Sequence, residues 1–384
     1  MLLTGKHNTL LLALMWLTIA CGHRPRIKPI DPGFPPAPFV PAAAPDVKWD
    51  IKLPTAASFI MQLDSESLLV ATHRGELRLL NLADGSRSGF AWQPQRSGIY
   101  SLARSPDGAY LYYSAERHTN LQALDLRRGR VKWQRKDLPV SGAMTCNDTI
   151  LVTTYKDGSL TALDAGNGST LWESTVKGSR YCGNWLFDDV VLTLNDRGIL
   201  GAYPISGPAS GANGQLHKPD WTRQLSLTPA TVGRANFRLL ALADSKGRIM
   251  AFNPATRDVV FETSVTAPVY SRPVVTDSMI IVADASGMVT ALAAGNGALL
   301  WEYPGPGLVN LPLMMANQPT AAVVVPFARG LVIALDYTTG AEIWRYQAGK
   351  TLRLVTLTSA GVVVADRGNH LVLLGPAELE GHIQ

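Results

Sequence analysis

The chain has 384 residues, and its 35 Lys and Arg against 30 Asp and Glu give a formal charge of +5. This excess is spread along the sequence, without the basic run or aromatic platform that nucleic-acid binding requires. Composition therefore argues against a nucleic-acid partner.

The first twenty residues have the pattern of an export signal. Lys6 and His7 precede an apolar run from Leu10 to Ala20, which is too short to span a bilayer. We therefore expect residues 1–20 to be a signal peptide. The segment LTIAC, ending at Cys21, resembles a bacterial lipobox, in which the cysteine receives acyl chains. Cys21 is the predicted lipidation site, and a secretory signal with an incidental cysteine is the alternative.

Residues 21–46 are predicted to be a tether. Eight prolines lie between His23 and Lys48, with almost no strand pattern. A proline-rich segment of 26 residues at about 3.1 Å each reaches roughly 80 Å. Several acyl chains would hold such a protein stably on a membrane. Gly22 after the cysteine, rather than Asp, favours the periplasmic side of the outer membrane if the source is Gram-negative.

One phrase then recurs along the chain. Gly158 to Trp172 reads GSLTALDAGNGSTLW, Gly287 to Trp301 reads GMVTALAAGNGALLW, and Gly330 to Trp344 reads GLVIALDYTTGAEIW. Looser copies run from Asn120 to Trp133 and from Gly247 to Phe261. Self-similarity at a fixed period means stacked copies of one supersecondary unit.

Each copy is predicted to be four antiparallel strands, which we call a, b, c and d from inside to outside. Apolar and polar residues alternate with a period of two, which is typical of strands. Pairs such as Asp157-Gly158 and Asn167-Gly168 between the alternating runs are strong hairpin signals. Four-stranded units at a period of about 40 residues indicate a β-propeller. An aromatic residue recurs on strand d, at Trp92, Trp133, Trp172, Trp221, Phe261, Trp301 and Trp344.

The sequence also predicts how the ring closes. After Trp344 the chain supplies strands a to c once more and lacks a final strand d. The segment Val47–Pro54 has the shape of a d strand with its loop, so Trp49 should complete the last blade. The predicted fold is all-β, an eight-bladed propeller over residues 47–376 closed by an N-terminal strand, with a C-terminal tail at 377–384.

The recurring phrase resembles the PQQ-like (quinoprotein) propeller repeat, in which the strand-d tryptophan docks against the neighbouring blade. Eight such blades behind a lipoprotein leader are similar to the family of B lipoprotein subunits of the outer-membrane β-barrel assembly machine. That resemblance implies a non-catalytic periplasmic scaffold in outer-membrane protein assembly, with the β-barrel assembly protein as a partner. A scaffold of another envelope complex, for secretion, motility or polysaccharide, is the second possibility.

The repeat also resembles that of PQQ-dependent dehydrogenases, which is the enzyme alternative. Many of those enzymes have adjacent cysteines or a CxxCH haem motif, and this sequence has neither. The histidines show no metal-ligand spacing such as HExxH, and no nucleophile–base pair stands out. Asp125, Asp164 and Asp336 recur at one repeat position, which favours turn caps over active sites. We therefore predict no catalytic residue, metal or cofactor, with a PQQ-binding dehydrogenase or sensor as the alternative.

Partner binding is predicted on one face of the ring. The d–a loops share this face with the b–c loops, whose basic residues mostly stand beside acids. The d–a loops are more one-sidedly basic, and several a–b turns on the opposite face are acidic. The assembly family docks its partner through Leu and Arg residues on this d–a face. The nearest candidates here are Lys177, Arg180, Tyr181, Arg223, Leu225 and Leu227.

Besides Cys21, the sequence has two cysteines, both in the predicted ring. Cys146 and Cys182 lie at opposite ends of neighbouring inner strands, so we expect their Cα atoms to be too far apart for a disulfide, although an oxidising compartment would favour pairing. The spacing from Trp172 to Trp221 exceeds the period, and the excess lies in residues 204–220. We expect that insertion to be a flexible loop on the face opposite the d–a loops.

Overall fold

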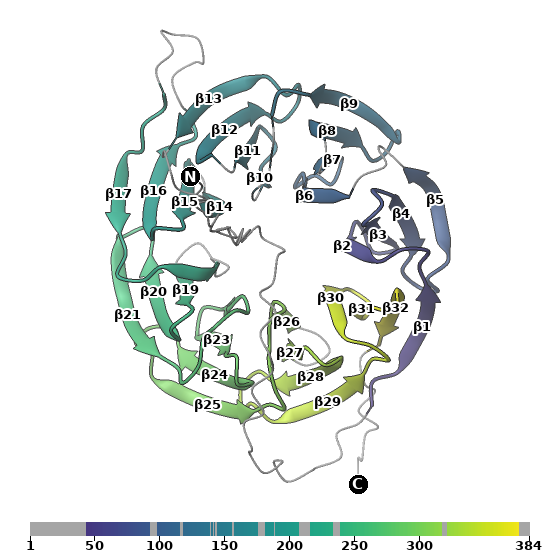
Figure 1. Cartoon of the computed structure of the whole chain (residues 1–384), viewed down its shortest axis with the longest axis vertical. Helices are drawn as coiled ribbons and strands as arrows, with labels where there is room; N and C mark the ends of the chain where they lie inside the picture. Colours follow the sequence, from purple (N-terminus) through teal and green to yellow (C-terminus); the bar gives the residue numbers. More distant parts are fainter. Residues whose placement is uncertain are drawn as a thin grey trace, which may run out of the picture.

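The structure of the protein is a computed structural model, which describes residues 44–92, 98–115, 118–138, 140, 142, 144–155, 157–175, 181–187, 189–206, 216–232, 239–316 and 321–375. These residues form eight four-stranded antiparallel sheets arranged as the blades of a ring (Figure 1). The prediction of an eight-bladed propeller is confirmed.

Strands follow one another from the centre of the ring outward in each blade. Blades 1 and 2 comprise β2 (Ala57–Gln62), β3 (Ser67–Thr72), β4 (Leu77–Asn81), β5 (Arg87–Trp92), β6 (Ile99–Arg104), β7 (Tyr110–Ala115), β8 (His118–Asp125) and β9 (Arg130–Arg135). Blades 3 and 4 comprise β10 (Met144–Cys146), β11 (Ile150–Thr154), β12 (Ser159–Asp164), β13 (Thr170–Thr175), β14 (Tyr181–Phe187), β15 (Val190–Asn195), β16 (Ile199–Pro204) and β17 (Trp221–Gln224). Blades 5 and 6 comprise β18 (Pro229–Val232), β19 (Leu240–Asp244), β20 (Arg248–Asn253), β21 (Asp258–Ser264), β22 (Val274–Val275), β23 (Met279–Ala283), β24 (Met288–Ala293) and β25 (Leu299–Pro304). Blades 7 and 8 comprise β26 (Met314–Ala316), β27 (Ala322–Pro326), β28 (Leu331–Asp336), β29 (Glu342–Gln347), β30 (Leu352–Thr358), β31 (Gly361–Asp366), β32 (His370–Leu374) and β1 (Val47–Lys52).

Blade 8 joins the first described strand to the last three. Strand β1 pairs antiparallel with β32, so that Trp49 lies opposite Leu373 and Lys52 opposite His370. Closure by an N-terminal strand is therefore confirmed. It leaves blade 8 with the same four strands as the other blades (Figure 1).

The hydrophobic core lies in layers between neighbouring blades. Strands b and c supply most of it, because both of their faces meet another blade; β11 and β27 are buried along their whole length. Between blades 7 and 8, for example, Val324 and Val332 pack in one cluster with Val364 and Val372. Burying such a side chain contributes roughly 1.5–3 kcal/mol.

The strand-d aromatics dock on the following blade. The indole nitrogen donates to a backbone carbonyl in that blade's c–d connection in four cases: Trp49 to Leu82 (2.9 Å), Trp133 to Ala165 (3.1 Å), Trp172 to Ile205 (3.0 Å) and Trp301 to Tyr337 (3.0 Å). A turn glycine makes room for the ring: a Cβ on Gly168 would come within 2.6 Å of the Trp133 ring.

The other strand-d aromatics vary around this arrangement. The ring of Phe261 lies against Gly297 in the same way. Trp344 is buried at 7% exposure, and Trp221 is half-buried with its ring 6.4 Å from that of Phe252. The side chain of Trp92 lies outside the described residues.

Turn caps account for the recurring aspartates after strand c. The Oδ1 atom of Asp164 accepts hydrogen bonds from the backbone nitrogens of Gly166 (2.8 Å) and Asn167 (2.9 Å). Asp125 and Asp336 accept equivalent pairs of bonds in blades 2 and 7. The interpretation of these residues as turn caps is confirmed.

The inserted segment is anchored at its C-terminal end. The backbone nitrogen of His217 donates to the Glu173 carbonyl (2.7 Å), and its Nε2 lies 3.0 Å from the Pro204 carbonyl. Its ring is buried at 7% exposure, 4.6 Å from the Trp172 ring. Our expectation of a flexible loop is therefore wrong for residues 216–220, while residues 207–215 lie outside the described chain. In the described part of the chain, no helix has the length and hydropathy needed to cross a bilayer.

Candidate partner-docking face

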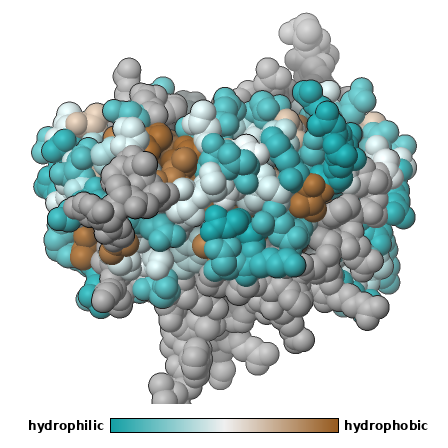
Figure 2. Space-filling model, turned by 90° about the horizontal axis from the view of Figure 1, so that it is seen from above, coloured by the Kyte–Doolittle hydropathy of each residue, from teal (hydrophilic) through white to brown (hydrophobic). Residues whose placement is uncertain are grey.

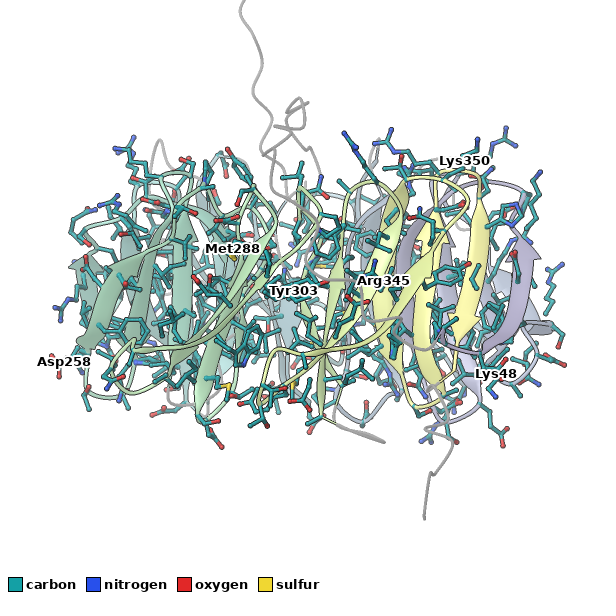
Figure 3. The ribbon with its side chains drawn as sticks, turned by 90° about the horizontal axis from the view of Figure 1, so that it is seen from below. Lys48, Asp258, Met288, Tyr303, Arg345 and Lys350 are labelled. Atoms are coloured by element: carbon teal, nitrogen blue, oxygen red, sulfur yellow. The ribbon has the colours of Figure 1, made fainter. Side chains whose placement is uncertain are left out.

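The ring has two faces that differ in the loops they carry. Lys350, in the d–a loop after β29, stands at one rim, whereas Lys48 and Asp258, at the starts of β1 and β21, stand at the other (Figure 3). We call these the d–a face and the c–d face. On the side of the ring seen in Figure 2, the coloured surface between these faces is mostly hydrophilic, with separate hydrophobic spots.

Two of the predicted docking leucines belong to the core. Leu225 and Leu227 are 5% and 2% exposed, and they pack between blades 4 and 5 with Leu242 and Phe252. Buried there, neither side chain offers the surface that the predicted contact with a partner needs. A loop sequence does not reveal that both side chains turn inward between two blades.

Arg223 is half exposed but joins the same two blades. Its guanidinium donates to the carbonyl of Arg257, lies 5.7 Å from the Phe252 ring centre and 4.0 Å from the Asp258 carboxylate. Ser226 in the adjoining loop donates to Glu262 at 2.8 Å. The segment from Arg223 to Leu227 therefore holds blade 4 to blade 5, which leaves little of it for a partner.

The other predicted docking segment is only partly described. Lys177 and Arg180 lie outside the described residues. Tyr181 opens β14, where its backbone pairs with Asn195, and its side chain is not described. These three residues remain a prediction from the sequence.

Cations elsewhere on the d–a face also serve the ring. Arg135 forms an ion pair with Asp137 (2.6 Å) and donates to the Gly168 carbonyl (2.8 Å). The hydrogen bond from Arg135 lowers the pKa of Asp137, and burial opposes this only in part. Arg353 donates to the Ala57 carbonyl (2.9 Å) across the seam between blades 8 and 1. The d–a face is thus less openly basic than the loop composition predicts.

The acidic a–b turns on the opposite face are locally satisfied as well. The Oδ1 atom of Asp64 accepts from the nitrogens of Glu66 (2.9 Å) and Ser67 (2.7 Å). The Ser105 hydroxyl donates to Asp107 at 2.6 Å and, with the Ala109 nitrogen, lowers the pKa of that carboxyl. These acids cap turns, so their recurrence has a structural cause.

Neither the metal-ligating side chains nor the thiol of Cys146 indicates a reactive centre in the part of the chain that the structure describes. Among the described residues, no three His, Cys, Asp or Glu side chains come together as metal ligands. The thiol of Cys146 is free and donates to the Arg104 carbonyl (3.1 Å), and burial raises its pKa to about 12. Such a thiol is protonated at neutral pH and is a poor nucleophile. The side chain of Cys182 lies outside the described residues.

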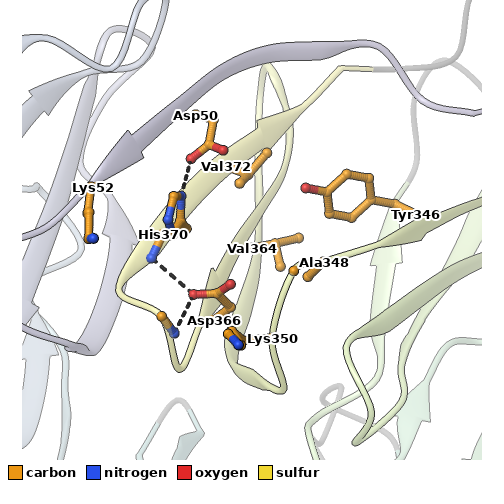
Figure 4. Close-up of a pocket in the computed structure, with 11 residues that line it drawn as sticks. Asp50, Lys52, Tyr346, Ala348, Lys350, Val364, Asp366, His370 and Val372 are labelled. Atoms are coloured by element: carbon orange, nitrogen blue, oxygen red, sulfur yellow. Dashed lines mark hydrogen bonds and ion pairs between the residues drawn. The ribbon is translucent and has the colours of Figure 1, made fainter.

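The sequence did not point to a cleft of about 370 Å³ between blades 7 and 8 (Figure 4). Its lining comes from β29 and the loop after it, β31, β32 and β1, so residues from both ends of the chain meet there. His370 lies between two acids: its Nδ1 is 2.9 Å from Asp50, and its backbone nitrogen donates to Asp366 at 3.0 Å. Tyr346, Lys52 and Lys350 complete the polar part of the lining.

The family model described as outer membrane protein assembly factor BamB matches residues 57–208 and 156–374. The chain belongs to this family. The match spans the ring from β2 in blade 1 to β32, the third strand of blade 8. The resemblance of the repeat to the PQQ-like propeller is therefore confirmed.

Solved structures agree with the fold. BamB from Moraxella catarrhalis superposes with a TM-score of 0.67 at 17% identity, covering 86% of this chain and 100% of that one. The computationally designed Ika8 protein gives 0.69 at 14%, covering 85% and 99%. Saccharomyces cerevisiae Sqt1 gives 0.72 at 11%, covering 87% and 100%. At such identities the likeness shows the fold alone. No curated protein sequence matches the chain significantly.

Proposed function

We propose that this BamB-family propeller is a non-catalytic scaffold in outer-membrane protein assembly, held by lipid at the periplasmic side of the outer membrane. The family match across residues 57–374 carries this proposal. The structural use of the repeat supports it, because the aspartates cap turns and the tryptophans join blades.

A pull-down tests the scaffold role. The tagged full chain, recovered from detergent-solubilised membranes, should bring down the β-barrel assembly protein, identified by mass spectrometry. Recovery of a secretion, motility or polysaccharide complex instead would show that the protein is a scaffold of that complex. A red-shifted quinone spectrum with dye reduction, after PQQ and Ca²⁺ are added to purified protein, would contradict the non-catalytic role.

The d–a face is the proposed docking surface. A charge reversal at position 180, Arg180→Glu, should reduce recovery of the partner if basic d–a loops meet an acidic surface. Arg130, exposed at the start of β9 and so on the c–d face, offers a matched control. Equal recovery of the partner with Arg180→Glu and with Arg130→Glu would contradict docking at the d–a face.

Lipidation at Cys21 is proposed from the lipobox-like segment. Cells grown with a clickable palmitate analogue should label the wild-type protein and leave Cys21→Ala unlabelled. The variant should also leave the membrane fraction, because the acyl chains supply the anchor. Unlabelled wild-type protein would show that the cysteine is incidental.

A further inference from the structure

Three blades have a buried aspartate where strand b passes into the b–c turn. Asp244, Asp284 and Asp366, in blades 5, 6 and 8, are 2%, 1% and 4% exposed. In each one, Oδ1 accepts backbone N–H bonds from the b–c turn that follows. The three carboxylates are therefore equivalent in position and in the use of one oxygen.

Neighbouring side chains satisfy the second oxygen in two of these blades. In blade 5, Arg248 Nε donates to Asp244 Oδ2 (2.7 Å), and its Nη1 donates to the Ser226 carbonyl in the preceding d–a loop (2.9 Å). In blade 6, the Thr266 hydroxyl, also from the preceding d–a loop, donates to Asp284 Oδ2 (3.2 Å). A buried carboxylate oxygen needs such a donor, since leaving a buried charged group unmatched is costly.

Blade 8 has neither of these two donors. The residue four positions after Asp366 is His370, where blade 5 has Arg248, and the imidazole turns instead to Asp50. No donor on Asp366 Oδ2 is found within the described chain. The result is the 370 Å³ cleft, with this carboxylate in its lining (Figure 4).

The surroundings of the cleft match those of Arg248. The d–a loop before blade 5 and the d–a loop before blade 8 are held in the same way. The side-chain nitrogen of Gln224 donates to the Arg197 carbonyl in one b–c turn, and that of Gln347 donates to the Arg329 carbonyl in another. Ser226, whose carbonyl accepts from Arg248, lies two positions after Gln224. Gly349, which lines the cleft, lies two positions after Gln347. Val364 and Val372 provide an apolar wall for an aliphatic stem.

We propose that this cleft binds the guanidinium group of an arginine side chain presented by a partner protein. The group would bond Asp366 Oδ2 and the d–a loop as Arg248 does in blade 5. Guanidinium suits the place because it is planar, has several donors and is more weakly hydrated than ammonium. Lys52 and Lys350, both exposed at the cleft, carry the strongly hydrated ammonium. An anionic ligand would be repelled by the carboxylate of Asp366, so the cleft does not suit one. The site does not depend on which envelope complex the protein serves.

Binding of Nα-acetylarginine amide to the full chain in detergent, measured by calorimetry, tests the proposal. We expect binding that Asp366→Asn weakens at least tenfold. That substitution keeps the turn cap, because Asn195 holds the equivalent place in blade 4 and its Oδ1 accepts from the Arg197 and Ile199 nitrogens. The citrulline and lysine analogues should bind at least tenfold more weakly than the arginine ligand. Equal binding to Asp366→Asn, or equal binding of the citrulline, lysine or acetylglutamate analogue, would overturn the proposal.

A second variant tests the same site from within. His370→Arg supplies the missing guanidinium, so it should abolish binding of the arginine ligand and raise the melting temperature. Arginine binding to this variant with wild-type affinity would also overturn the proposal. If His370→Arg does not fold, Asp366→Asn still decides the matter.

Discussion

The indole nitrogen of Trp49 donates a hydrogen bond to the carbonyl oxygen of Leu82, 2.9 Å away and 33 positions further along the chain. Trp49 belongs to blade 8 and Leu82 follows strand c of blade 1. The strand that closes the ring is therefore held on two sides, by β32 within its own blade and by the next blade.

Removing the Trp49 side chain should weaken the whole ring. We expect Trp49→Ala to lower the free energy of unfolding by about 3–5 kcal/mol, because a large buried side chain is lost. Trp49→Phe keeps most of the packing and should cost about 1 kcal/mol for the lost hydrogen bond. Urea denaturation measures both, with Leu299→Ala, at a residue 58% exposed, as the control. A wild-type midpoint for Trp49→Ala would contradict this role.

The turn glycines should tolerate substitution only where no ring approaches. Gly168 has a φ of +76°, and its Cβ would come within 2.6 Å of the Trp133 ring. We expect Gly168→Ala to cost roughly 1–3 kcal/mol from the backbone conformation alone. Gly89, in β5, also has a positive φ (+68°), but nothing lies within 4 Å of its would-be Cβ. Equal stability losses for Gly168→Ala and Gly89→Ala in thermal unfolding would show that the ring contact is unimportant.

Acid should destabilise the ring through its turn caps. The Thr339 hydroxyl, helped by the Thr339 and Thr338 nitrogens, holds the pKa of Asp336 below its usual value, and burial opposes this only in part. A carboxyl with a lowered folded pKa stabilises the fold above its unfolded pKa, near 3.8, and loses that contribution as pH falls through the folded pKa. Asp336→Asn, which keeps the Oδ1 acceptor as Asn253 does in blade 5, should lose less stability than the wild type between about pH 5 and about pH 2. An unchanged acid slope would refute this.

Cys146 should be chemically silent in the folded protein. Burial raises its pKa to about 12 from 9.0, so at pH 8 its thiolate population falls about a thousandfold relative to an exposed thiol, at about tenfold per unit. In a Cys182→Ser background, mass spectrometry should find maleimide on Cys146 only after unfolding. Rapid modification of the native protein would mean that the thiol is accessible.

The sequence predicts the ring well because its signals are local. Glycines at turns, an aspartate after strand c and a tryptophan on strand d each report a contact within one blade or with the next. Repetition multiplies that information, which is why the partner strand for β32 could be found at Trp49. Closure is thus predictable from the chain alone.

The surface is less predictable, because it depends on where side chains turn. Leu225 and Leu227 stand in a loop and yet are buried, since that loop passes between blades 4 and 5. The cleft beside Asp366 arises because His370 stands where blade 5 has Arg248, a difference that acquires meaning only when the two blades are superposed. Neither feature has a periodic signal.

The most direct test of the assembly role is to remove the protein from its own cells and measure folded outer-membrane barrel proteins by their heat-modifiable migration. We predict that the folded fraction falls, and that the full chain restores it better than Cys21→Ala does. Wild-type amounts of folded barrel proteins in the absence of this chain would contradict the role of this propeller in their assembly.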